Sequence, residues 1–309
     1  RAQEVVVIHA ARSPELVLAL LGILKAGAAF MILDPSYPPA RLREMLQIAR
    51  PRGFVHLEKA GSLPDEVDAW TTSVPCRVRL PAFAAGDTVV GELWSGSAKT
   101  APQVHIQPED MAYVTFTSGS TGTPKCLQGT HRPLSHFMKW YTQALQLNTA
   151  DRVTMFSGLA HDPLLRDVFT PLWIGGTLCI PDEEALVSGR VGDWMNEQKI
   201  TLIHLTPPLV DVLTVGHETS QVSWSSLRYA VFGGDSLRPV HLERIKQFAP
   251  QARCVNGYGA TETPQIMCWY EVSPEFSSNV EQVPIGQGID GVQVLVLDAP
   301  AHDDRRRHF

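Results

Sequence analysis

The amino-acid sequence predicts an α/β protein with stacked, mostly parallel sheets. A β-like run over 4–8 is followed by a helix pattern from Pro14, a second apolar run over 28–33 and an amphipathic pattern over 40–50. Strand and helix patterns in alternation favour parallel strands joined by crossover helices. Later in the chain, short apolar runs end in glycine-rich segments, as strands do where an open α/β sheet binds a ligand.

The first helix illustrates how the elements are assigned. Ser13 stands at its N-cap position, Pro14 at its first turn and Gly27 at its stop. The residues at 34–39 form a Pro-rich turn before the next helix. The further expected elements are strands at 53–56, 76–80 and 152–156 and from Met111 and Tyr229, helices at 134–145 and 239–248, and a loop over 82–108.

Composition indicates an ordinary globular protein. The 309 residues are 44% hydrophobic and 19% charged, and a net charge of −6 offers no basic surface for nucleic acid or an anionic membrane. The five widely spaced cysteines include no Cys-x-x-Cys pair, which favours neither a disulfide framework nor a zinc site. No apolar stretch reaches about 18 residues, and no signal-peptide pattern precedes the first strand. The expected location is therefore the cytoplasm.

A hydroxyl-rich and glycine-rich loop follows the run from Met111. Its glycines let the backbone approach a ligand, its hydroxyls donate hydrogen bonds, and Lys125 adds a charge after Pro124. A solvated linker is the ordinary explanation for such a cluster, but the β-rich run before it and the single lysine favour a phosphate site. The Walker A spacing is absent. The residues expected to bind phosphate are Thr117, Ser118, Gly119, Ser120, Thr121 and Gly122, with Lys125.

The sequence Thr-Ser-Gly-Ser-Thr-Gly-Thr-Pro-Lys at 117–125 resembles the phosphate-binding signature of the adenylate-forming enzymes. This superfamily comprises acyl-CoA synthetases, luciferases and the adenylation domains of non-ribosomal peptide synthetases. Residues 24–39 are similar to the peptide-synthetase adenylation domains in particular. The resemblance implies the large N-terminal part of that fold, with two α/β subdomains over 1–282 and the start of a small β-barrel over 283–298.

The resemblance covers residues 5–298, and the tail 299–309 matches no part of the family pattern. It implies that the opening of the N-terminal subdomain is missing. It also implies that the ribose-binding aspartate, the hinge and the C-terminal subdomain with its catalytic lysine lie beyond residue 309. Adenylate formation is then expected to need that subdomain as a partner.

Two later motifs carry the residues that the resemblance assigns to the nucleotide. Gly233 and Gly234 leave room for the base, Asn256 bonds the adenine amino group, and Tyr258 stacks on the ring. Thr261 contacts the α-phosphate and Glu262 holds Mg²⁺. The residue types suit these roles, although from the residues alone Tyr258 would be a packing residue and Glu262 a solvated one. The implied cofactors are ATP and Mg²⁺. The catalytic set is Lys125, Thr261 and Glu262, and the nucleotide set is Gly233, Gly234, Asn256, Gly257, Tyr258 and Gly259.

The segment 157–173 places four ionisable residues, His161, Asp162, Arg166 and Asp167, in an apolar frame. Buried charges need partners or a ligand. From the residues alone, an ion pair between Asp162 and Arg166 on one helix is the commoner explanation. The resemblance favours a different role, because Asp162 matches the carboxylate that holds the substrate ammonium in amino-acid-activating adenylation domains.

The resemblance also implies a substrate pocket. The residues 161–171 with His204 are especially similar to fungal α-aminoadipate reductases, whereas Gln265 stands where those reductases have a second arginine. Arg166, helped by His204 and Gln265, is expected to meet a polar or acidic side chain, with α-aminoadipate as the named candidate. Alternatively, Arg166 pairs with Asp167 and the pocket takes a neutral side chain. The expected pocket residues are Asp162, Pro163, Arg166, His204, Val231, Gly233, Gly257, Gln265 and Ile266.

The implied reaction is ATP-dependent activation of an amino acid as an aminoacyl-adenylate, followed by transfer to a carrier-protein thiol. Cys126 departs from the family pattern, which has glycine there. The alternatives are the adenylation domain of a carrier-linked reductase, an acyl-CoA or aryl acid ligase, and a non-catalytic remnant that binds nucleotide and serves in docking. The ligase is disfavoured because Asp162 would face an acid with no ammonium group.

Overall fold

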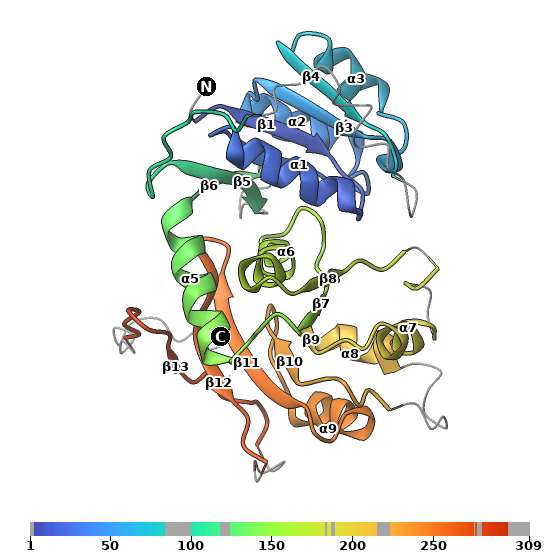
Figure 1. The fold of residues 1–309 in the computed structure, drawn as a ribbon, viewed down its shortest axis with the longest axis vertical. Helices are drawn as coiled ribbons and strands as arrows, with labels where there is room; N and C mark the ends of the chain where they lie inside the picture. Colours follow the sequence, from blue (N-terminus) through green and yellow to red (C-terminus); the bar gives the residue numbers. More distant parts are fainter. Residues whose placement is uncertain are drawn as a thin grey trace, which may run out of the picture.

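The structure is a computed structural model that describes residues 3–83, 100–117, 124–182, 184–186, 189–214, 223–274, 276 and 280–295. It has the predicted α/β architecture, with two sheets stacked and helices packed against them (Figure 1). No helix within these ranges is both long and apolar enough to cross a membrane.

The first sheet, sheet A, has the strand order β4-β3-β1-β2-β5-β6. Its strands are parallel except β6, which pairs antiparallel with β5. The strands are β1 (Val5–His9), β2 (Ala29–Leu33), β3 (Gly53–Leu57), β4 (Cys76–Leu80), β5 (Met111–Thr117) and β6 (Lys125–Thr130). The connecting helices are α1 (Pro14–Lys25), α2 (Pro39–Ala49), the 3₁₀ turn η1 (Glu58–Ala60) and α3 (Asp65–Thr71).

The second sheet, sheet B, has the order β13-β12-β11-β10-β9-β7-β8, and its β12 and β13 run antiparallel to their neighbours. The strands are β7 (Arg152–Thr154), β8 (Thr177–Cys179), β9 (Leu202–Leu205), β10 (Tyr229–Phe232), β11 (Arg253–Ala260), β12 (Thr263–Glu271) and β13 (Gln287–Gly288). The helices are α5 (His131–Ala144), α6 (Pro163–Ile174), α7 (Val191–Glu197), α8 (Pro207–Thr214) and α9 (Pro239–Phe248).

Three apolar clusters divide the molecule into five layers. Leu42 and Met45 of α2 pack with Val7 and Phe54 on the outer face of sheet A. A larger cluster joins α1, α5 and α6 with the two sheet faces that look toward each other, and Figure 1 shows α1 and α6 between the sheets. Helices α7, α8 and α9 cover the outer face of sheet B. The two sheets thus share one apolar layer, across which residues from both can meet at a site.

Most predicted elements are present, but several elements of the structure were not predicted, among them α3, β6 and β12. Helix α3 is short and buries only Val67 and Thr71, and two buried residues are too few to give a recognisable helical pattern in the sequence. Strand β6 is an edge strand with no fully buried position, and its pairing with β5 rather than its own pattern makes it a strand. Strand β12 extends sheet B along β11, so Asn256 and Tyr258 lie inside a strand instead of beyond its end. Most of the loop expected over 82–108 lies outside the described residues.

Close packing between β5 and β6 depends on a glycine. The ring of Tyr113 on β5 is 3% exposed and lies over Gly129 of β6, where an added Cβ would be 2.1 Å from the ring Cζ. Real Cβ atoms do not approach other atoms so closely, so a larger residue would displace the ring. Tyr113 belongs to the shared apolar layer.

We therefore expect Gly129→Ala to lower the free energy of unfolding by about 1–3 kcal/mol through overpacking. Gly22→Ala in α1 is the matched control, because no atom lies within 4 Å of its added Cβ. The control should raise stability by about 0.5–1 kcal/mol through helix propensity. Urea denaturation of both variants measures the difference, and equal effects would contradict the packing argument.

Two histidines meet on neighbouring strands of sheet A. The rings of His9 and His56 stack with centroids 5.3 Å apart, and their Nδ1 atoms are 3.3 Å apart. Burial, helped by the charge of His56 and opposed by that of Asp34, lowers the pKa of His9 to about 4. Burial also lowers the pKa of His56. The folded protein therefore favours the neutral form of both rings.

The pH dependence of stability follows from this. Between pH 6.5 and pH 4, unfolded His9 binds a proton that folded His9 does not, so stability should fall as the pH drops through this range. His9→Gln should reduce the proton uptake on unfolding by about one proton there. Urea denaturation as a function of pH checks this, and an unchanged slope in the variant would rule it out.

Candidate functional site

A cavity of about 630 Å³ lies where strands β9 and β10 end, next to the β11–β12 hairpin and the start of α6. This volume is in the usual range for small-molecule sites. The cavity brings together most of the pocket residues expected from the sequence. Those that line it are Asp162, Pro163, Arg166, His204, Gly233, Gly234, Gly257, Gly259, Thr261, Gln265 and Ile266.

Asp162 stands directly before α6, and its carboxylate does not pair with Arg166. Its Oδ1 accepts a hydrogen bond of 2.9 Å from the hydroxyl of Thr261. Its backbone carbonyl accepts one of 2.9 Å from the amide nitrogen of Gln265. The ion pair expected from spacing alone is absent from the described residues. The β11–β12 hairpin therefore holds the carboxylate of Asp162, while α6 binds only its backbone carbonyl, through the amide of Leu165.

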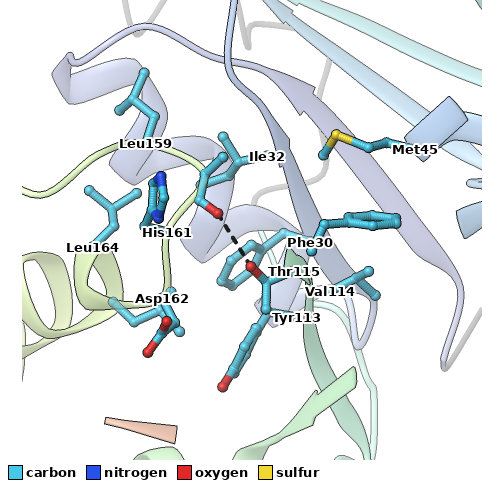
Figure 2. Close-up of a pocket in the computed structure, with 13 residues that line it drawn as sticks. Phe30, Ile32, Met45, Tyr113, Val114, Thr115, Leu159, His161, Asp162 and Leu164 are labelled. Carbon is cyan, nitrogen blue, oxygen red and sulfur yellow. Dashed lines mark hydrogen bonds between the residues drawn. The ribbon is translucent and has the colours of Figure 1, made fainter. Parts of the chain in front are cut away.

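Figure 2 shows a smaller adjoining space in which Asp162 and Tyr113 extend toward the same region from different layers. The hydroxyl of Thr115 on β5 donates to the carbonyl of Ala160 at 3.3 Å, drawn as a dashed line. Burial, together with the negative charge of Asp162, raises the pKa of Tyr113. The loop that carries Asp162 is thus attached to sheet A as well as to sheet B.

Gln265 has an unusual backbone for a residue with a side chain. Its φ is 69°, its side chain is 3% exposed, and its Oε1 has no partner among the described residues. The hairpin imposes this geometry, because β11 has a bulge between Tyr258 and Ala260. A Cβ at Gly259 would lie 1.8 Å from the carbonyl of Gln265, so this close approach requires glycine. Gln265 thus lines the cavity, while its Oε1 is a buried acceptor without a partner among the described residues.

Arg166 is a buried cation that has no ion pair within the described part of the chain. Its side chain lines the cavity, the residue is 7% exposed, and its Nε has no hydrogen-bond partner there. The neighbouring Asp167 is fully buried and is bound elsewhere. His204 Nδ1 lies 2.7 Å from Asp167 Oδ1, and the amide of Ser157 donates to Oδ2 at 2.8 Å.

The surroundings of His204 define its protonation. Burial, helped by the charge of Arg166 and opposed by Asp167, lowers the pKa of His204, so the ring is neutral near pH 7. The Nδ1–H then donates to Asp167, and Nε2 accepts from the hydroxyl of Tyr141 at 2.8 Å. His204 lines the cavity as expected, but both of its nitrogens are bonded within the protein. Its contact with a ligand is limited to the ring.

Asn256 is buried and does not line the cavity, so the nucleotide role expected for it stays a prediction. Its Nδ2 donates to the carbonyls of Val283 and Pro284 at 3.1 and 2.9 Å, which fixes the orientation of the amide. The Oδ1 is then the atom left to accept from an exocyclic amine such as that of adenine. The same bonds hold the segment that leads into β13 against sheet B. Whether residues 283–298 begin a separate barrel stays a prediction.

Other predicted site residues lie away from the cavity. Val231 is fully buried in the shared apolar layer and does not line the cavity, because its side chain points to the core. Tyr258 is 53% exposed, and Glu262 and Lys125 are exposed as well. No cluster of three potential metal ligands occurs among the described residues. The phosphate-loop residues Ser118, Gly119, Ser120, Thr121 and Gly122 lie outside the described residues, and Thr117 ends β5 next to them.

Several residues that the sequence analysis did not select also line the cavity, among them Ser157 and Thr206. Thr206 directly follows β9, and Ser157 lies three positions after the end of β7. Their place just beyond the carboxyl ends of parallel strands is the signal that could have identified them. Cys126, in contrast, is a regular member of β6 opposite Phe116, and burial raises the pKa of its thiol.

Asn256 provides a direct check of the described geometry. In Asn256→Asp, a carboxylate oxygen would face the two carbonyls that now accept hydrogen bonds. We expect the free energy of unfolding to fall by about 1–3 kcal/mol, the usual effect of leaving buried polar groups unpaired. The loss should shrink as the pH falls and the new carboxyl group is protonated. Urea denaturation at two pH values measures this, and wild-type stability would contradict the assigned bonds.

Comparisons with known proteins agree with the fold. Residues 1–306 match the family of AMP-binding enzymes. L-2-aminoadipate reductase of Saccharomyces cerevisiae is 35% identical over 96% of this chain, and gramicidin S synthase 2 of Brevibacillus brevis is 31% identical over 93%. The chain spans 22% of the first relative and 6% of the second.

Solved structures give the same result. The AMPPNP-bound form of the non-ribosomal peptide synthetase FmoA3 aligns with a TM-score of 0.78 at 26% identity. The alignment covers 94% of this chain and 29% of that one. The form of FmoA3 bound to α-methyl-L-serine-AMP aligns with a TM-score of 0.77 at 25% identity, over 94% of this chain and 31% of that one. This chain therefore belongs to the family of AMP-binding, adenylate-forming enzymes.

Proposed function

We propose that this chain activates an amino acid with an acidic side chain as an aminoacyl-adenylate, in the manner of a peptide-synthetase adenylation domain. The observation that carries the proposal is the charge distribution of the cavity. Its lining includes the carboxylate of Asp162 and the guanidinium of Arg166, and the guanidinium has no ion pair among the described residues. An ion of each sign at one cavity suits a ligand that carries both an ammonium group and an anion.

The ammonium group of the substrate would bind at Asp162. Among the described residues, the carboxylate of Asp162 accepts one hydrogen bond from a side chain, that of Thr261, and so retains acceptor capacity for further donors. A bond between a carboxylate and an ammonium group is strong at a site with little water.

The side chain of the substrate would extend toward Arg166. Leaving a buried guanidinium unpaired costs several kcal/mol, so a ligand anion there would bind with a large gain. Pro163, Gly257 and Ile266 would form the apolar wall. A Cβ at Gly257 would lie 2.6 Å from the Cδ1 of Ile266, so glycine there keeps the cavity open. Val231 would contribute by packing behind this wall.

The nucleotide would bind on the β10 and β11 side of the cavity. Gly233 and Gly234 would leave room for the base, Asn256 Oδ1 would accept from the adenine amine, and Tyr258 would cover the ring. Thr261, Lys125 and the loop from Thr117 to Gly122 would hold the phosphates. Glu262 would bind Mg²⁺, which usually takes one or two carboxylates together with substrate phosphates. The ion would offset the phosphate charge.

The reaction requires mainly positioning. A carboxylate oxygen of the amino acid attacks the α-phosphorus of ATP, a new P–O bond forms, and the bond to the β-phosphate breaks with the electron pair leaving on pyrophosphate. Holding the two substrates in one cavity supplies most of the acceleration. Donors around the phosphates stabilise the charge that moves to the leaving group. The acyl group would then pass to a carrier-protein thiol.

A second candidate is the adenylation step of a carrier-linked reductase. It is favoured by Arg166 and His204 at the cavity and by five fungal L-2-aminoadipate reductases, which are 34–35% identical to this chain. Both candidates share the same first step and differ in what receives or reduces the acyl group. The activation step is therefore the one to test on this chain.

Calorimetry with ATP and Mg²⁺ and with a panel of amino acids tests the proposal. We expect ATP binding that weakens in Lys125→Ala, and stronger binding of L-2-aminoadipate and L-glutamate than of L-leucine or L-phenylalanine. Asp162→Asn should weaken every amino acid by at least about tenfold, the effect of about 1.4 kcal/mol. Arg166→Leu should weaken only the acidic ones.

The outcomes separate the parts of the proposal. If the wild type prefers leucine, the acidic substrate is ruled out, but the adenylation function is not. Failure to bind ATP would remove the adenylation function itself. Circular dichroism of each variant checks that a loss of binding is not a loss of folding.

A further inference from the structure

The buried carboxylate of Asp167 is the centre of a polar chain that crosses the molecule. His204 Nδ1 and the amide of Ser157 bind its two oxygens at 2.7 and 2.8 Å, and Tyr141 binds the far side of His204 at 2.8 Å. Arg12, which follows β1 of sheet A, donates to the carbonyls of Ser157, at 3.0 Å, and Met155. We call Arg12, Ser157, Asp167, His204 and Tyr141 the Asp167 network.

Two cations, Arg12 and Arg166, could balance the negative charge of Asp167. The hydrogen bonds connect Asp167 to Arg12, which is the more distant of the two in sequence. Arg12 is attached to the same residue, Ser157, that binds Asp167. The charge of Asp167 opposes the effect of burial, which lowers the pKa of Arg12. Arg166 is adjacent in sequence, but consecutive residues on a helix face different directions. Both oxygens of Asp167 already accept hydrogen bonds, so Asp167 does not engage the guanidinium of Arg166. That guanidinium is left to interact with a ligand in the cavity.

We propose that Arg12 and His204 are positioning residues that determine specificity, because they hold and balance Asp167 and thereby leave Arg166 available to an anionic group of the ligand. Arg12 does not line the cavity and acts through Ser157 and Asp167. The ligand class in this inference rests on the proposed function. The arrangement of the Asp167 network is independent of the proposed function.

The protonation state of His204 can be measured without a ligand. The charged and titratable groups around its ring are Asp167 and Arg166 on α6 and Tyr141 on α5, with Tyr229 of β10 acting on Tyr141. Arg12 acts through Asp167. Without the positive charge of Arg12, less of the negative charge of Asp167 is offset at His204. A nearby negative charge that is not offset favours the imidazolium. The pKa of His204 should then rise.

The first experiment titrates His204 by NMR of histidine labelled with ¹⁵N. In the wild type we expect a neutral ring protonated on Nδ1, with a pKa below 6.5. Arg12→Met should raise this pKa, whereas Arg12→Lys, which keeps the charge, should change it little. If Arg12→Met does not fold, Arg12→Gln keeps a donor without the charge and replaces it. An unchanged pKa in the uncharged variant would overturn the inference.

The second experiment compares two amides at one position. The side-chain nitrogen of asparagine lies near the place of histidine Nδ1, and that of glutamine near Nε2. His204→Asn should therefore keep a donor to Asp167, and His204→Gln should keep only the contact with Tyr141. Calorimetry with L-glutamate and its neutral counterpart L-glutamine measures the preference for an anionic side chain.

We expect His204→Asn to retain the wild-type preference for glutamate, and His204→Gln and Arg12→Met to reduce it by about tenfold. Equal loss in both His204 variants would mean that the residue serves only packing, and would overturn the inference. If the wild type itself prefers glutamine, the acidic ligand of the proposed function fails, and the titration of His204 still decides whether Arg12 controls the network.

Discussion

The hydrogen bonds of the Asp167 carboxylate constrain much of the structure around the cavity. A fully buried carboxylate without partners would cost several kcal/mol, so its two oxygens must receive donors from surrounding elements. These donors come from the segment after β7 and from β9, and Arg12 ties the same segment to sheet A. Helix α6, which carries Asp167, is thereby fixed against both sheets. The adjacent residue Arg166 is fixed with it, at the cavity and without an ion pair in the described structure.

The layered arrangement explains why a site forms here. The shared apolar layer brings α6 and the inner faces of both sheets together, and the polar groups that remain within it lie where parallel strands of sheet B end. Asp162 extends from the loop before α6, bonded to the β11–β12 hairpin on one side, while its loop is bonded to Thr115 of β5 on the other. Residues more than a hundred positions apart are therefore held by a few hydrogen bonds. The strained backbone of Gln265 is kept by the same hairpin.

Much of the fold could be predicted from the sequence, because α1, β2 and α9 have strong apolar patterns and clear end signals. Strand β6 could not, since its strand character comes from pairing with β5 and not from its own residues. At the site, Asp162 and Arg166 were selected by residue type and family resemblance, and both line the cavity. The partner of Asp167 was not predictable, because spacing along α6 cannot show that His204, 37 positions away, approaches it. No sequence pattern indicated a role for Arg12, because its partners are backbone carbonyls, which every residue has.

The chemistry of the cavity wall also limits the kind of ligand it can hold. The amide nitrogen of Gln265 is occupied by the carbonyl of Asp162 and its Oε1 is buried, so this residue supplies no second cation. The nitrogens of His204 are both occupied within the protein. Arg166 is then the one charged donor among the residues described at the cavity. A guanidinium binds one carboxylate through two parallel hydrogen bonds and is selective for that planar geometry. The wall therefore agrees with the carboxylate side chain that we propose for the substrate, which would be held by the same helix that begins beside Asp162.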